Sequence, residues 1–68
     1  MEIVLNGAPR SIADGTSVTA LVESLGLTGK RIAVEINLEI VPRSLHASQL
    51  LQSGDRVEIV HAIGGGWR

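Results

Sequence analysis

Residues 16–27 read TSVTALVESLGL and predict the helix around which the fold is built. Four apolar residues recur there at i, i+3, i+4 and i+7, which a helix gathers on one face: Val18, Leu21, Val22 and Leu25. Thr16 is the expected N-cap, Gly26 the left-handed residue after the helix, and Leu27 the residue that folds back on the last turn. A helix of about three turns with one apolar face needs a sheet to cover.

The sequence before this helix predicts a β-hairpin. Residues 2–15 read EIVLNGAPRSIADG, and Asn6-Gly7 is a strong hairpin signal because both residues tolerate a positive φ. Pro9 suits a turn or an edge strand, since it has no N–H to donate in a central ladder. Ile12 marks a short second strand before the chain turns toward the helix.

Three more strands are expected after the helix. RIAVEIN at 31–37 alternates apolar and polar residues, and EIVPR at 39–43 is a short extended piece that Pro42 confines to an edge. RVEIVHAI at 56–63 is the last strand. Apolar Val60 lies on the face opposite Val57 and Ile59, which predicts a central strand covered on part of both faces.

Residues 44–51 are expected to form an irregular or single-turn segment. We expect this segment to carry three leucines into the core: Leu45, Leu50 and Leu51. SGD at 53–55 makes a turn before the last strand. The resulting order is β-β-α-β-β(short)-β, an α+β fold with a mixed sheet of four to five strands covered by one main helix. This is the outline of a β-grasp, or ubiquitin-like, domain over residues 1–63.

Residues 64–68 are expected to be a flexible tail, because the chain continues as GGGWR. Glycine loses more backbone freedom on ordering than any other residue, so three in succession are unsuited to a packed structure. A frayed terminus is one interpretation. The other is a thin peptide that enters a narrow channel in a partner.

Composition excludes several classes of function. The formal charge of −1 offers no basic field for nucleic acid or an anionic membrane surface, and the lack of cysteine removes disulfides and thiolate chemistry. His46 and His61 are isolated, so neither a metal site nor a catalytic histidine is expected. The apolar stretches are too short to span a bilayer, and no signal peptide is recognisable. We expect a soluble, cytoplasmic protein with no catalytic residues of its own.

Several stretches together resemble the ThiS family, the sulfur carriers of thiamine biosynthesis. They are VLNG, DGTSVTALVESLG, VEINLEIVPR and LQSGDRVEIVHAIGGG, which cover nearly the whole chain. The combination is specific, whereas GGG alone is a weak signal. The resemblance implies a β-grasp fold and a carrier rather than an enzyme, with no bound cofactor.

The resemblance also implies the chemistry of the tail. The family's terminal glycine falls on Gly66, with Gly65 and Gly64 recognised by partners. An adenylyltransferase of the E1-like, ThiF-like type would use ATP to adenylate the Gly66 carboxylate. A sulfur donor system such as a cysteine desulfurase would convert it to a thiocarboxylate, and a ThiG-like thiazole synthase would take the sulfur. An α-carboxylate is ionised at neutral pH, because its pKa is about 3.3–3.7, and can attack the ATP α-phosphate.

The sequence departs from the family pattern after Gly66. Trp67 and Arg68 follow, so Gly66 has no free carboxylate, and a bulky indole would not fit a glycine-sized channel. Either a peptidase removes Trp67-Arg68 first, as ubiquitin-like precursors are unmasked, or this copy does not carry sulfur.

Other residues are candidates for contact with partners. Ile63 leads directly into the tail, and Arg43 and Arg56 could contact acidic groups of a partner near it. The acidic residues of the predicted strands have no spacing that defines a paired site, and solvated strand faces explain them: Glu35, Glu39, Asp55 and Glu58.

Two other functions compete with the thiamine carrier. The small subunit of molybdopterin synthase is also a sulfur carrier that ends in Gly-Gly, but the compact length and INLEIVPR favour thiamine. A β-grasp interaction module without carrier chemistry would explain Trp67-Arg68. The acidic balance and the lack of surface aromatics speak against an RNA-binding module.

Overall fold

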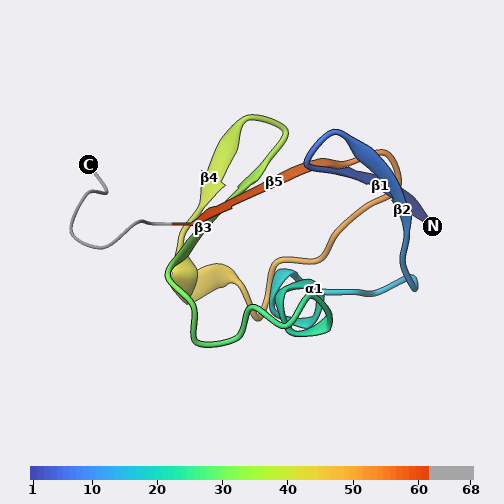
Figure 1. Ribbon diagram of the computed structural model, residues 1–68. Helices are drawn as coiled ribbons and strands as arrows, with labels where there is room; N and C mark the ends of the chain where they lie inside the picture. Colours follow the sequence, from blue (N-terminus) through green and yellow to red (C-terminus); the bar gives the residue numbers. More distant parts are fainter. Residues whose placement is uncertain (62–68) are drawn as a thin grey trace.

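The computed structural model describes residues 1–61, which form a five-stranded mixed sheet with one helix against one face (Figure 1). The strands are β1 (Glu2–Leu5), β2 (Ala8–Ser11), β3 (Ile32–Ile36), β4 (Glu39–Val41) and β5 (Arg56–His61). The helix α1 spans Val18–Ser24, and a 3-10 turn, η1, spans Arg43–Leu45. The predicted element order and α+β class are confirmed. The predicted tail, 64–68, lies outside the described residues.

The strands lie in the order β2-β1-β5-β3-β4. β1 and β5 are parallel, and the other neighbouring pairs are antiparallel. The edges are therefore β2, which contains Pro9, and β4, which Pro42 follows directly. Both prolines therefore lie at the edges of the sheet, as predicted. There, the missing N–H does not remove a hydrogen bond between central strands.

The first hairpin turns at Asn6-Gly7, as predicted. Leu5 pairs with Ala8, so only these two residues connect β1 and β2. Their φ angles are 49° and 84°, and both lie in the left-handed region that a type I′ turn requires. This turn matches the right-handed twist of the two strands.

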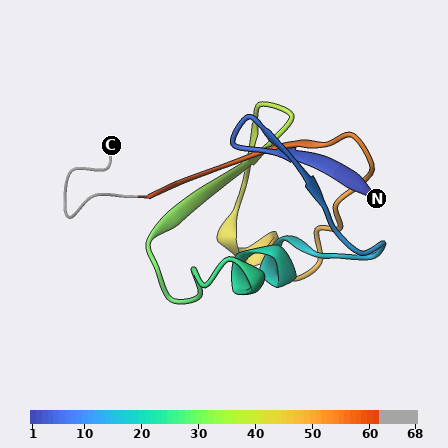
Figure 2. The ribbon, with the colours of Figure 1, turned by 45° about the vertical axis from the view of Figure 1, so that its right-hand side comes forward.

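The core lies between α1 and one face of the sheet, and α1 lies on the same side of the sheet in both views (Figures 1 and 2). Its buried members are all aliphatic: Ile3, Val18, Leu21, Val22, Val34, Leu51, Val57 and Ile59. The alternation within β3 and β5 places their inward side chains on the face that α1 covers. The predicted apolar helix face is confirmed, with Leu25 partly buried beside the core.

The C-terminus of α1 is closed by a Schellman motif. Gly26 has a φ of 72°, and its N–H donates to the Glu23 carbonyl at 3.0 Å. The Leu27 N–H donates back to the Val22 carbonyl at 3.1 Å. Both the left-handed glycine and the returning leucine were predicted. The helix has 7 residues, about two turns rather than the predicted three.

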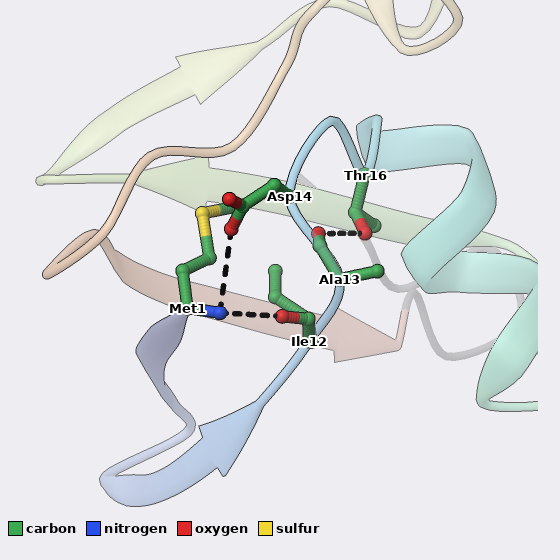
Figure 3. Close-up of polar contacts among 5 residues, drawn as sticks. All are labelled: Met1, Ile12, Ala13, Asp14 and Thr16. Carbon is green, nitrogen blue, oxygen red and sulfur yellow. Dashed lines mark hydrogen bonds and ion pairs between the residues drawn. The ribbon is translucent and has the colours of Figure 1, made fainter.

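The N-cap of α1 is Ser17, and the prediction of Thr16 is wrong. The Ser17 hydroxyl accepts from the Ala20 N–H at 3.0 Å. The Thr16 hydroxyl instead donates to the Ala13 carbonyl at 2.6 Å, across the turn that precedes the helix (Figure 3). Thr16 and Ser17 both carry a hydroxyl that could cap the helix. The Thr16 hydroxyl is bonded within the preceding turn, so Ser17 is the cap.

We expect Ser17→Ala to lower the free energy of unfolding by about 1 kcal/mol. The substitution leaves the Ala20 N–H without its side-chain acceptor at the start of a short helix. Urea denaturation of the variant and the parent chain measures the loss. Ser53→Ala is the control, because Ser53 lies in an exposed turn away from α1. Equal losses in the two variants would contradict the assignment of the cap.

Two of the three leucines predicted in the core are exposed. Leu45 and Leu50 are 48% and 52% exposed, and only Leu51 is buried. An isolated bridge pairs Leu50 with Ser17, and the Leu51 N–H donates to the Thr16 carbonyl at 2.9 Å. In this extended pairing successive side chains point to opposite sides, so Leu51 turns inward and Leu50 outward.

The outer face of the sheet is open in the described part of the chain. Val60 is 45% exposed, so the prediction that both faces of β5 are partly covered is wrong. β5 is central, as predicted, but α1 covers one face of the sheet only (Figure 2). An apolar residue on a central strand therefore does not by itself indicate a second covering layer.

Candidate functional site

β5 is the strand that precedes the glycine segment, which comprises residues 64–66. It lies between β1 and β3 in the centre of the sheet, and its Val57 and Ile59 side chains are buried. Its pairing with β3 continues to His61, the last described residue, which pairs with Ile32. The glycine segment thus begins 3 residues beyond a strand that β3 pairs with to its last residue.

Two asparagine side chains brace β5. The Asn6 Oδ1 accepts from the Ile59 N–H at 2.9 Å, beyond the point where β1 stops pairing. The Asn37 Oδ1 accepts from the Arg56 N–H at 3.0 Å. Both asparagines occupy left-handed positions in hairpin turns. Sequence reasoning identified only the turn role of Asn6 and missed both bracing bonds, because they join residues far apart in the chain.

The two arginines predicted to contact partners are both exposed, at different places. Arg56 begins β5, at the end of the strand away from His61. Arg43 begins η1 after β4, which runs in the same direction as β5. Roles in partner contact remain predictions for both residues. Ile63 and the glycines 64–66 lie outside the described residues.

The described part of the chain has few polar groups in protected surroundings. Within residues 1–61 no group of three or more His, Cys, Asp or Glu residues could hold a metal ion, and no polar residue is buried. The His46 Nε2 lies 3.0 Å from the Val41 carbonyl, a contact that ties η1 to β4. His61 is exposed on β5. No helix in this range has the length and apolar character to cross a membrane.

Two acidic residues meet on the open face of the sheet. Glu35 on β3 and Glu58 on β5 are direct cross-strand partners. With Asn37, Leu38 and Arg56 they line a hollow of about 320 Å³. From the sequence, these acids were predicted to lie on solvated strand faces without a defined pairing. Strand register, which spacing in the sequence does not give, brings them together.

A second hollow is lined by β4 and by residues between Pro42 and Asp55. Its volume is about 510 Å³, and two of the leucines that were predicted to be buried, Leu45 and Leu50, help to line it. The backbone between these leucines supports α1, because the Gln49 carbonyl accepts from the Val18 N–H at 2.9 Å.

Comparison with known proteins identifies close relatives. The model of the ThiS family matches residues 3–66. The chain is 46% identical over 66 residues to the thiazole synthase of Paramagnetospirillum magneticum, covering 97% of this chain but 20% of that protein. It is 35% identical to the sulfur carrier protein ThiS of Escherichia coli, covering 97% and 100% of the two chains. The crystal structure of the thiamine biosynthesis protein (ThiS) of Geobacter metallireducens superposes with a TM-score of 0.84 at 30% identity, covering 97% and 100%.

Proposed function

The chain belongs to the ThiS family, and on this premise we propose that it carries sulfur for the thiazole moiety of thiamine. Its extent supports the proposal, because it aligns with the whole of the Escherichia coli sulfur carrier. The chain spans only a fifth of the length of the Paramagnetospirillum magneticum thiazole synthase. The role we propose for residues 1–66 is that of the carrier.

One observation carries the assignment of Gly66 as the reactive residue. The family match ends at residue 66, which is five residues after the last residue of β5. Once Gly66 is a free terminus, its carboxylate attacks the α-phosphorus of ATP and displaces pyrophosphate. The terminal sulfur of the donor's persulfide then displaces AMP from the same carbonyl carbon, and a thiol reductant cleaves the resulting acyl disulfide, which leaves the thiocarboxylate and a disulfide. The folded body supplies no group to either step; its part is to present the end of the chain.

Gly64 and Gly65 make this end narrow. A glycine has no Cβ, so a partner's pocket can close directly around the backbone. We propose that the activating enzyme recognises these residues through their peptide groups. β3 pairs with the preceding strand as far as His61, so the distance from the docked body to Gly66 depends on the short segment after His61.

Three partners are required by this chemistry. An E1-like adenylating enzyme binds ATP, a sulfur donor system such as a cysteine desulfurase supplies sulfur, and a thiazole synthase accepts it. The relative from Paramagnetospirillum magneticum supports the third, because a thiazole synthase there includes a region similar to this chain. We propose that the carrier acts in the cytoplasm.

We further propose that a peptidase removes Trp67-Arg68. The family match stops directly before these residues, and the amide bond between Gly66 and Trp67 leaves no carboxylate to adenylate. Hydrolysis of this single bond produces the terminus that the family's chemistry needs.

A chain that stops at Gly66 tests the carrier function. With the adenylating enzyme, ATP and the sulfur donor system, we expect its intact mass to rise by the difference between sulfur and oxygen. Reactions without ATP should show no change. Gly66→Ala in the same short chain should react at least about a hundredfold more slowly, because a Cβ misplaces the carboxylate in the adenylation pocket. A Gly66-ended chain that never gains sulfur would contradict the proposal. Sulfur transfer only to a molybdopterin-forming partner would assign the chain to the molybdopterin pathway instead of the thiamine pathway.

A further inference from the structure

The hollow beside η1 leaves apolar side chains uncovered within residues 1–61. It has a volume of about 510 Å³, and its apolar part is formed by Val41, Pro42, Leu45 and Leu50. The two leucines are 48% and 52% exposed, although backbone hydrogen bonds hold the segment that carries them to α1. Exposed apolar side chains on a fixed, concave surface are typical of a binding site. This surface is here called the η1 hollow.

The charged residues that line the η1 hollow are both acidic. Glu39 of β4 and Asp55 border it, and no lysine, arginine or histidine of residues 1–61 lines it. Asp55 already accepts hydrogen bonds from the Asn37 side chain and the Gln52 N–H, at 3.1 and 2.8 Å. Glu39 takes part in no ion pair within the described residues. The η1 hollow therefore fits a ligand that has an apolar group with a cation beside it.

Residues 67 and 68 of the chain are such a ligand. Trp67 is the only tryptophan, the chain has no tyrosine or phenylalanine, and Arg68 follows it directly. An aromatic side chain buries roughly 150–250 Å² of surface, which suits a wall of exposed leucines. A guanidinium donates its hydrogen bonds in a planar fork that matches a carboxylate.

Residues 62–67 are long enough to reach the η1 hollow. β4 runs in the same direction as β5 and continues into η1, so η1 and the end of β5 lie at the same end of the sheet (Figure 1). Val41 is in one row with Val34 and Ile59, two strands across from β5. At about 4.8 Å per strand and about 3.3 Å per residue, Val41 lies roughly 12 Å from His61. Six residues span up to about 20 Å.

The same segment can also turn back toward the body. β5 points past the end of the sheet, so the chain has to reverse direction to reach the η1 hollow. Gly64, Gly65 and Gly66 suit such a turn, because glycine adopts a positive φ without strain. A tether this short gives the groups at its end an effective concentration of about a millimolar at the body. Contacts too weak to bind a free dipeptide are then sufficient for docking.

We propose that Trp67 and Arg68 dock in the η1 hollow of their own chain. The indole packs against Leu45 and Leu50. The guanidinium forms an ion pair with Glu39 at the acidic side of the hollow. The chain's own tail is preferred to that of a second copy, because the tether keeps it at a higher concentration than other molecules reach in dilute solution.

Docking protects the bond between Gly66 and Trp67. A peptidase has to bind the peptide on both sides of the bond that it cuts, so it acts only on the released tail. This consequence rests on the proposed function, in which removal of Trp67-Arg68 unmasks the Gly66 carboxylate. Once the bond is cut, the dipeptide loses its tether and leaves the η1 hollow. The release of Gly66 is therefore a one-way step.

The fluorescence of Trp67 tests the docking in the chain that ends at Arg68. We expect emission at a shorter wavelength than in the same chain unfolded by urea, and slower quenching by acrylamide. Leu45→Gln should move the emission to longer wavelength and raise the quenching severalfold. The urea midpoint should change little, because the Leu45 side chain is half exposed. Val60→Gln is the control, since Val60 is 45% exposed and lies outside the η1 hollow.

A charge exchange tests the ion pair. Glu39→Arg places a cation opposite Arg68 and should raise the quenching of Trp67 severalfold. Arg68→Glu in the same chain should restore the parent value, because the two charges are again opposite. Glu23→Arg is the matched control: it makes the same change of net charge on the exposed side of α1 and should leave the quenching unchanged.

Proteolysis measures the protection of the tail. Chymotrypsin cuts after large apolar and aromatic residues, so it probes the bond between Trp67 and Arg68. It should cut this bond severalfold faster in Leu45→Gln than in the parent chain, and at the parent rate in Val60→Gln. An extract of the native cells should likewise remove Trp67-Arg68 faster from Leu45→Gln, which intact mass records.

The outcomes separate this inference from the proposed function. Trp67 emission that matches the urea-unfolded chain, or that Leu45→Gln leaves unchanged, overturns the docking. Emission that shifts to longer wavelength on dilution overturns docking within one chain and makes a second copy the donor of the tail. Equal removal of Trp67-Arg68 from the parent and from Leu45→Gln overturns the protection of the bond. A chain ended at Gly66 that takes no AMP contradicts the carrier function, while the fluorescence result stands.

Discussion

A chain that ends at Arg68 is expected to take no AMP from the adenylating enzyme. The Gly66 carboxyl carbon is then part of the amide bond to Trp67, and an amide oxygen is no nucleophile for the ATP α-phosphate. The free carboxylate of Arg68 lies behind an indole that a glycine-sized channel excludes. Pyrophosphate release and intact mass, measured beside the Gly66-ended chain, give the result directly.

The folded body provides the control for this result. Both chains share residues 1–66, so the longer chain should still bind the enzyme and inhibit adenylation of the shorter one. Incubation with an extract of the native cells should restore its reaction, with loss of the mass of Trp67 and Arg68. Adenylation of a chain that retains Arg68 would contradict the masking by these two residues.

Leu21→Ala should lower the free energy of unfolding by about 2–5 kcal/mol, the largest expected effect on stability. Leu21 is 1% exposed and fills the space between α1 and the sheet, so truncation leaves a cavity that a short helix cannot collapse without losing other contacts. A small domain has only about 5–15 kcal/mol in total. Urea denaturation with the slope checked for two-state behaviour measures the loss.

Glu23→Ala is the matched substitution on the same helix. Glu23 is exposed, two positions from Leu21, and its side chain points away from the sheet. Its removal should change the free energy of unfolding by no more than about 0.5 kcal/mol. Similar losses in both variants would contradict the assignment of the buried helix face.

The sequence predicted the elements well wherever one short signal determines the local structure. Asn6-Gly7 specifies its turn through positive φ, Gly26 specifies the helix end, and Pro9 is confined to an edge strand. The resemblance to the ThiS family also predicted the fold, which the structure and its relatives confirm. These signals act within a few residues, so no knowledge of the distant chain is needed.

Predictions failed where the answer depends on contacts between distant residues. Thr16 and Ser17 are equivalent as caps until the turn at Ala13 engages one of them. The orientation of Leu50 depends on its bridge to Ser17. The pairing of Glu35 with Glu58 follows from strand register alone. The sequence predicted the candidate site only as the end of the chain. It did not predict the open face of the sheet beside Leu38.

The central position of β5 has a consequence for folding during synthesis. The ribosome makes β1 and β3 first, yet each pairs with β5, which is the last of the five strands to emerge. Until then both strands present an unpaired edge, and edges of this kind recruit other chains. Parallel pairing of β1 with β5 also closes a long loop, which slows folding. The sheet therefore closes only after the last of these strands has been made.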